Sequence, residues 1–202
     1  IIWASMHLKH HRFTDKAGDP HSPHLLGGPW KLFWKHERVY AEAAKDPELV
    51  AHYGRGLPKS QLDFLLERGL IGLVLGWTLF IVVFWLIAGS WVGGVIGVVT
   101  YGVQFLAYLK SGAVVNAFGH WYGYRTFNDK DNEATNLWWA GLFIAGEGYH
   151  ENHHHLLSSP KMSYLRKEFD LSWLVLEVLM AVRLARQLCP TINEKEAAKK
   201  AA

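Results

Sequence analysis

Residues 69–109 read GLIGLVLGWTLFIVVFWLIAGSWVGGVIGVVTYGVQFLAYL and contain no charged side chain. A helix needs about 20 apolar residues to cross a bilayer, so this run is long enough for two crossings. Gly89 and Ser90 interrupt the run near its middle and favour a turn there. The stretch therefore predicts an all-α membrane protein with a transmembrane hairpin, its helices at about 69–88 and 91–109.

The Lys and Arg residues around this run predict its orientation. Arg55, Lys59 and Arg68 precede the run, Lys110 and Arg125 follow it, and the turn carries no charge. Because cytosolic flanks of membrane helices are enriched in Lys and Arg, we expect both outer ends of the hairpin in the cytosol. The alternative, a hairpin buried in a large soluble core, leaves the long uncharged run unexplained.

The composition excludes several classes of protein. The net charge is only +3 and the basic residues form no continuous stripe, so we expect no nucleic-acid partner. Cys189 is the only cysteine, which excludes an intrachain disulfide. The chain begins at Ile1 without an initiator Met or signal-peptide pattern, and we therefore expect a fragment of a longer protein.

The polar segments flank the hairpin and divide the chain into four parts. Residues 1–60 form a cytosolic segment, 61–110 the hairpin, 111–189 a cytosolic helical cap, and 190–202 a charged tail, of which we expect Glu194–Ala202 to be dispensable. Within the first part, Gly and Pro predict a loop from Asp15 to Trp30, and Asp46-Pro47-Glu48 predicts a helix start. Asp170 is the expected cap of an apolar interfacial helix in the cap.

The pattern His-x-x-His-His occurs twice, at His7, His10 and His11 and at His150, His153 and His154. Positions i, i+3 and i+4 of a helix lie about 5–6 Å apart on one face, so each pattern aims three imidazoles at one point. Imidazole suits iron, zinc, copper and nickel, and the spacing alone does not choose between them. Two unrelated surface clusters are the alternative interpretation.

One further histidine completes the predicted site. Asn116 and His120 lie beyond the second apolar helix with i, i+4 spacing, and a continued helix would present both on one side. The remaining histidines have simpler expected roles. His21 and His24 should be solvated or lie outside the ligand shell, His36 and His52 should be solvated, and His155 should not be a ligand.

Seven converging imidazoles are too many for a single zinc, which takes four positions in structural sites and three protein ligands in catalytic ones. They predict two metals held between helices at the membrane face, and neutral ligands suit a redox metal. No Ser or Cys stands in an obvious relation to a base, so a nucleophilic route is not supported. The seven are His7, His10, His11, His120, His150, His153 and His154.

Four motifs carry a resemblance to a known family. Residues 7–15, 19–23, 116–125 and 146–154 read HLKHHRFTD, DPHSP, NAFGHWYGYR and GEGYHENHH. In this order they resemble the membrane fatty acid desaturases of the stearoyl (delta-9) type. The resemblance implies a mushroom-shaped α-helical protein with four transmembrane helices and a cytosolic di-iron cap. It also implies that the seven histidines ligate iron and that Asn116 holds an iron through water.

The activity implied by this resemblance is O₂-dependent removal of two hydrogens from adjacent methylenes of a saturated acyl chain, which gives a cis double bond. Electrons in the family come from NAD(P)H through a reductase and a small haem or iron–sulfur carrier. A hydroxylase on the same site, a zinc hydrolase of membrane lipids and a non-catalytic membrane metal-binding protein are the alternatives.

The sequence departs from the family in two places. A further histidine box and a pair of membrane helices precede the first motif in the family and are absent here, so we expect this chain alone to be inactive and to bind fewer than two irons. Ser5 and Met6 stand where animal CoA-using members often carry Arg-Asp. The acyl carrier, whether CoA, acyl carrier protein or a glycerolipid, is therefore left open.

Overall fold

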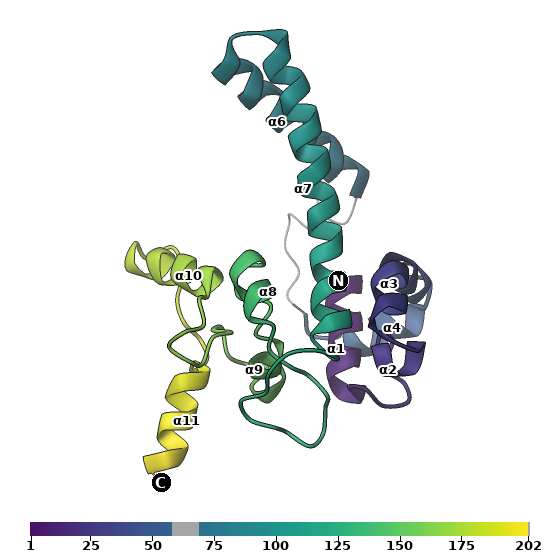
Figure 1. Ribbon diagram of the computed structural model, residues 1–202, viewed down its shortest axis with the longest axis vertical. Helices are drawn as coiled ribbons and strands as arrows, with labels where there is room; N and C mark the ends of the chain where they lie inside the picture. The colour runs from purple at the N-terminus through teal and green to yellow at the C-terminus, as the bar shows by residue number, and fades with distance from the viewer. Residues whose placement is uncertain (58–68, 202) are drawn as a thin grey trace.

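The computed structural model describes residues 1–57 and 69–201, and in these ranges the chain is helical (Figure 1). The helices are α1 (Ile2–Phe13), α2 (Pro23–Leu26), α3 (Pro29–Ala43), α4 (Pro47–Tyr53), α6 (Gly69–Ala88), α7 (Trp91–Phe118), α8 (Trp138–Phe143), α9 (His150–His155), α10 (Leu171–Ala181) and α11 (Ile192–Ala201). The described residues contain no strand, only isolated bridges from Asn136 to Tyr124 and to Tyr149. The all-α prediction is confirmed, whereas the predicted boundary at residue 60 lies outside the described residues.

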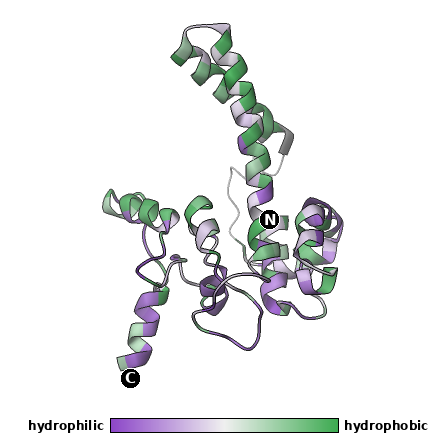
Figure 2. Ribbon diagram, viewed as in Figure 1, coloured by the Kyte–Doolittle hydropathy of each residue, from purple (hydrophilic) through white to green (hydrophobic). Residues whose placement is uncertain are grey.

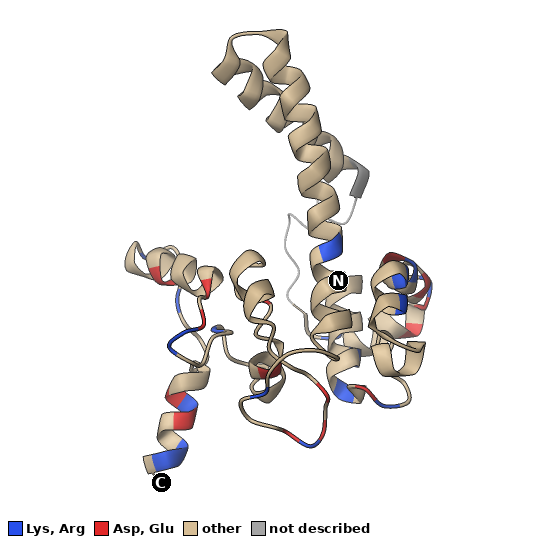
Figure 3. Cartoon of the chain, in the orientation of Figure 1, with Lys and Arg blue, Asp and Glu red and all other residues tan. Residues whose placement is uncertain are grey.

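Helices α6 and α7 form the predicted hairpin, and both are long and apolar enough to cross a membrane. Figure 2 shows mainly hydrophobic residues along the hairpin, and Figure 3 shows no charged residue along it until the lower part of α7, near α1. Large side chains such as Leu79, Leu86 and Ile87 are exposed, as lipid-facing residues would be. The two backbones approach closely at Gly97, where an added Cβ would lie 2.5 Å from the Phe80 carbonyl oxygen.

Helix α7 continues past the apolar stretch to Phe118, as the sequence predicts, and links the hairpin to the polar part. Phe33 of α3 stacks on Phe118 with ring centroids 5.5 Å apart, and Leu137 and Ala140 complete this small core. Lys110 Nζ lies 2.7 Å from Glu37 Oε1 and ties the same two helices together. The C-terminal end of α7 is therefore fixed against α3.

The remaining helices lie in two groups, with α1–α4 on one side of α7 and α8–α11 on the other (Figure 1). Their starts follow local capping chemistry. The Asp46 side chain accepts from the Glu48 N–H and the Asp170 side chain from the Trp173 N–H, which confirms both predicted helix starts. In the predicted loop, Ser22 caps the single turn α2 in the same way.

The start of the C-terminal tail packs against the cap. Ile192 is completely buried, and its backbone N–H donates to Ser159 Oγ at 3.0 Å. Asn193 Nδ2 donates to the Tyr164 carbonyl oxygen at 2.8 Å. Composition suggested a solvated tail because the charges of α11 dominate it, but the one apolar residue at its start docks against the cap.

Candidate metal centre

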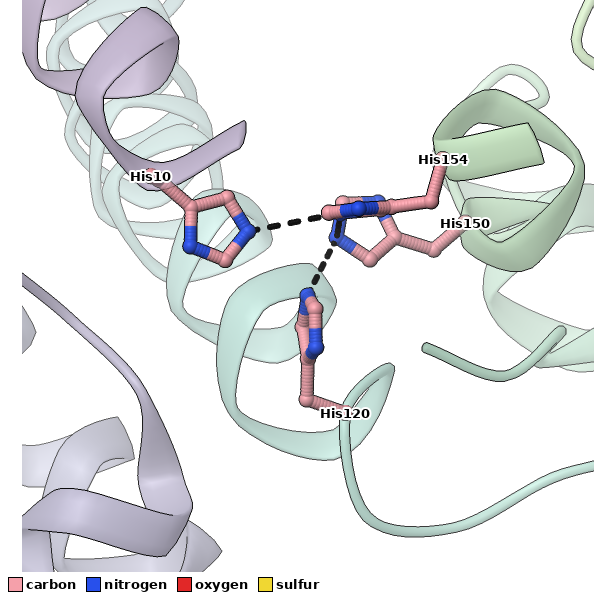
Figure 4. A group of neighbouring side chains, drawn as sticks. All are labelled: His10, His120, His150 and His154. Carbon is pink, nitrogen blue, oxygen red and sulfur yellow. Dashed lines mark hydrogen bonds between the residues drawn. The ribbon is translucent and has the colours of Figure 1, made fainter. Parts of the chain in front are cut away.

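Four histidines from three elements form the first group of the site (Figure 4). His10 comes from α1, His120 from the end of α7, and His150 and His154 from α9. The Nε2 atoms of His120 and His150 are 3.0 Å apart, those of His150 and His154 3.2 Å, and those of His10 and His154 3.3 Å. All four rings therefore present the same nitrogen to one small volume.

Three more histidines form a second group beside the first. The Nε2 atoms of His7, His11 and His153 make a triangle with sides of 2.9, 2.9 and 3.2 Å. The rings of His11 and His154, one from each group, have centroids 4.4 Å apart. The two groups are thus neighbours and share no residue.

The separations between these nitrogens fit metal coordination. A metal–imidazole bond of about 2.1 Å and a right angle between neighbouring ligands place two nitrogens about 3.0 Å apart. A hydrogen-bonded network is a poorer account, because in a triangle of neutral rings each Nε2 would have to serve both neighbours at once. The residues present therefore fit a pair of bound metal ions.

Burial keeps most of these rings neutral, with a lone pair available for a metal. Burial first, and then the neighbouring histidines, lower the pKa of His7 to about 3 and that of His153 to about 4. The same causes lower the pKa of His11, His150 and His154. Burial also lowers the pKa of His120, although the hydrogen bond to Asp15 opposes it.

Two carboxylates behind the rings set the tautomers. Asp19 accepts from His10 Nδ1 at 2.9 Å, and Asp15 accepts from His120 Nδ1 at 2.9 Å. With the proton on Nδ1, the lone pair of each ring is on Nε2 and faces the cluster. His24 Nε2 donates to the His120 carbonyl oxygen at 2.7 Å and holds the same residue from its backbone.

The structure brings all seven predicted histidines into the two groups. The prediction that each pattern aims three imidazoles at one point is wrong, because in each pattern the two histidines four positions apart stay together and the one at i+3 joins the other group. Asn116 lies outside both: it is buried on α7, and its Nδ2 is 3.3 Å from His36 Nε2. His155 also lies outside, as predicted, because Asp129 and Glu196 take its two nitrogens.

The expectation that His36 is solvated is wrong. The residue is buried, because α3 packs along α7 where Gly112 leaves room: a Cβ there would lie 3.3 Å from His36 Cε1. Burial lowers the pKa of His36 to about 4, against the opposing effect of Glu37.

His21, which was expected to be solvated or to lie outside the ligand shell, lies directly against a proposed ligand. Its ring is fully buried and stacks on His10 with centroids 4.3 Å apart. His10, Asp19 and His21 together form a third group of potential ligands. Asp19 and Ser22 are the residues of the sequence that could have indicated the burial of His21. Asp19 accepts the backbone N–H of His21, and Ser22 accepts that of His24.

The chain matches a known protein family. A family model described as fatty acid desaturase matches residues 1–168. The chain belongs to the fatty acid desaturase family. The match covers α1, the hairpin and α9, and so includes every histidine of the two groups.

Relatives of this desaturase chain carry names of the same kind. It is 31% identical over 207 residues to the delta-9 desaturase-like 1 protein of Arabidopsis thaliana, covering 96% of the chain and 62% of the relative. It is 30% identical over 194 residues to the delta-9 acyl-lipid desaturase 2 of the same plant, covering 92% and 57%.

A bacterial relative, the sn-2 palmitoyl-lipid 9-desaturase of Nostoc sp. (strain 36), is 29% identical over 198 residues, covering 93% of the chain and 63% of the relative. The chain thus spans about three-fifths of the length of the curated relatives it matches.

Proposed function

We propose that this chain forms the catalytic part of a membrane fatty acid desaturase with a di-iron centre. The observation that carries the proposal is the pair of neighbouring histidine groups, seven imidazoles whose Nε2 atoms converge without any carboxylate among them. Membership of the desaturase family supports the same reaction. His7, His10, His11, His120, His150, His153 and His154 would be the ligands, with Asn116 acting through water.

The reaction converts a saturated acyl chain, O₂, two electrons and two protons into a monounsaturated chain and two waters. An unactivated methylene has no acidic proton, so the bound irons supply the O₂-activating chemistry that side chains lack. The chain's own residues orient this centre. Asp15 and Asp19 hold the protons of His120 and His10 on Nδ1.

We further propose that the centre faces the cytosol, because Lys110 and Arg125 lie between the apolar run and the centre or beside the centre. The substrate would be an acyl-lipid or acyl-CoA, desaturated at the delta-9 position as the names of the relatives suggest. Electrons would come from NAD(P)H through a reductase and a small haem or iron–sulfur carrier.

The test is expression of this chain in place of the matching residues of a full-length relative. We expect iron in the purified protein and new cis-monounsaturated chains by gas chromatography of the host's fatty acids. His153→Ala should abolish the product, and His52→Ala, an exposed change on α4, should leave it unchanged. Hydroxylated chains would instead identify a hydroxylase, and zinc without iron would contradict the di-iron proposal.

A further inference from the structure

Helix α9 has a second face that the histidine pattern leaves unexplained. Glu151 lies between His150 and His153, and its side chain is completely buried. Its Oε1 accepts from the backbone N–H groups of Phe127 at 3.0 Å and Asn128 at 2.7 Å. Its Oε2 accepts from the Thr126 N–H and from Asn136 Nδ2, the latter at 3.2 Å. A buried carboxylate is therefore fully surrounded by donors.

The three backbone donors belong to the segment that follows His120. Residues 121–135 leave the end of α7 and contain no helix, and three consecutive N–H groups of that segment converge on one carboxylate. Thr135 continues the connection, since its hydroxyl donates to the Gly119 carbonyl oxygen at 3.0 Å and its own carbonyl accepts from the Glu151 N–H at 3.3 Å. Glu151 thus links the backbone beside His120 to the helix that carries His150 and His154.

Helix α9 needs such a link. It has six residues and no side-chain cap, and a helix of that length has little stability of its own. Asn152 supports it on the same side, because its Nδ2 donates to Glu168 Oε2 at 2.9 Å. The direction in which His150 and His154 point therefore depends on polar contacts outside the histidine groups.

We propose that Glu151 is a positioning residue that sets the distance between His120 and the two α9 histidines of the four-histidine group, and so the geometry of the metal bound there. This inference rests on the proposed metal centre. Glu151 is not itself a ligand, because both of its oxygens are taken by N–H donors and it belongs to neither histidine group.

The experiment measures Co²⁺ binding to the purified 202-residue chain, with the dissociation constant taken from chelator competition and the ligand geometry from the visible absorption of bound Co²⁺. Glu151→Gln places an amide NH₂ against N–H donors. We expect about tenfold weaker binding, the lower end of the range for residues that support ligands, and a changed absorption spectrum.

Asp170→Asn is the matched control. Asp170 is also a buried carboxylate that accepts three backbone N–H groups, from Met162, Ser163 and Trp173, but none of them adjoins a histidine of the site. The Asp170→Asn substitution should lower the melting temperature without changing the Co²⁺ spectrum. If Glu151→Gln changes stability alone, as the control does, the positioning role is overturned.

A second variant covers the case in which Glu151→Gln does not fold. Arg125→Met removes one partly exposed donor, Nε at 3.5 Å from Glu151 Oε1, and should weaken Co²⁺ binding in the same direction by about threefold or less. An unchanged constant and spectrum in a folded Arg125→Met protein would also count against the role. Failure of the unsubstituted chain to bind Co²⁺ or Fe²⁺ would instead contradict the proposed metal centre.

Discussion

At the scale of single residues, the site depends on groups that are not ligands. Asp19 accepts from His10 Nδ1 and also from the backbone N–H groups of Asp15 and His21. One carboxylate therefore fixes the tautomer of a proposed ligand and the path of the chain behind it. Asp19 lies outside the His-x-x-His-His pattern, and only its contact with His10 in the folded chain shows that it supports a ligand.

Asp19→Asn should weaken metal binding by about 10–100-fold, because the amide is a weaker acceptor for the Nδ1 proton and can present an NH₂ to it. The measurement is the Fe²⁺ or Co²⁺ dissociation constant by chelator competition. Asp46→Asn is the control, since Asp46 only caps α4 and asparagine caps equally well. Equal effects of the two substitutions would contradict the assigned role of Asp19.

His36→Ala should lower the free energy of unfolding by roughly 1–3 kcal/mol, because it leaves a gap between α3 and α7 and removes the partner of Asn116. His52→Ala on the exposed side of α4 should change it by less than about 0.5 kcal/mol. Denaturant titration in detergent, followed by circular dichroism, compares the two. An unchanged free energy of unfolding in His36→Ala would show that burial of the His36 side chain contributes nothing to stability.

At the scale of elements, α11 closes the cap around the last histidine helix. His155 stacks on Phe127 with ring centroids 3.8 Å apart, and its ring nitrogens contact Asp129 and Glu196. Glu196 belongs to α11, so the C-terminal helix, the segment after His120 and α9 meet at this one side chain. The tail therefore supports the site from the side opposite α1.

Removal of residues 190–202 should destabilise the cap by about 1.5–3 kcal/mol, the free energy of burying a side chain the size of Ile192. Removal of residues 199–202 alone should have little effect, because Lys199 is exposed and pairs only within α11. Melting temperatures of the two truncations make the comparison. Equal melting temperatures for the longer truncation and the intact chain would show that α11 is dispensable after all.

At the scale of the whole molecule, an apolar hairpin extends from one end of a polar cap that holds the histidines (Figures 1 and 2). The proposed centre lies in the cap near the end of α7, because His120 follows the last residue of that helix by only two positions. One continuous helix therefore connects the apolar region to the site.

A single-cysteine experiment tests the proposed orientation. In a Cys189→Ser background, Asp131→Cys lies on an exposed position of the cap and Ser90→Cys at the turn of the hairpin. A membrane-impermeant maleimide should label Asp131→Cys only after the cytosolic side is opened, and Ser90→Cys from the opposite side. Labelling of both positions from one side would contradict a membrane-spanning hairpin.

The sequence by itself determined the features that depend on local periodicity and composition. The uncharged run from residue 69 defined the hairpin, and the helical spacing predicted that His7 lies beside His11 and that His150 lies beside His154. The continuation of α7 toward His120 followed from the same rule. These predictions hold because a helix determines the directions of its own side chains, whatever it later packs against.

Only the tertiary structure decided which distant groups meet. His7 and His153 are in contact across 146 positions, and Asn116 and His36 across 80. The path of the segment after His120 depends on hydrogen bonds to Glu151, which no periodicity records. Solvation of His36 was a natural expectation from polarity, but packing against α7 buries it, because a few contacts outweigh the average character of a segment.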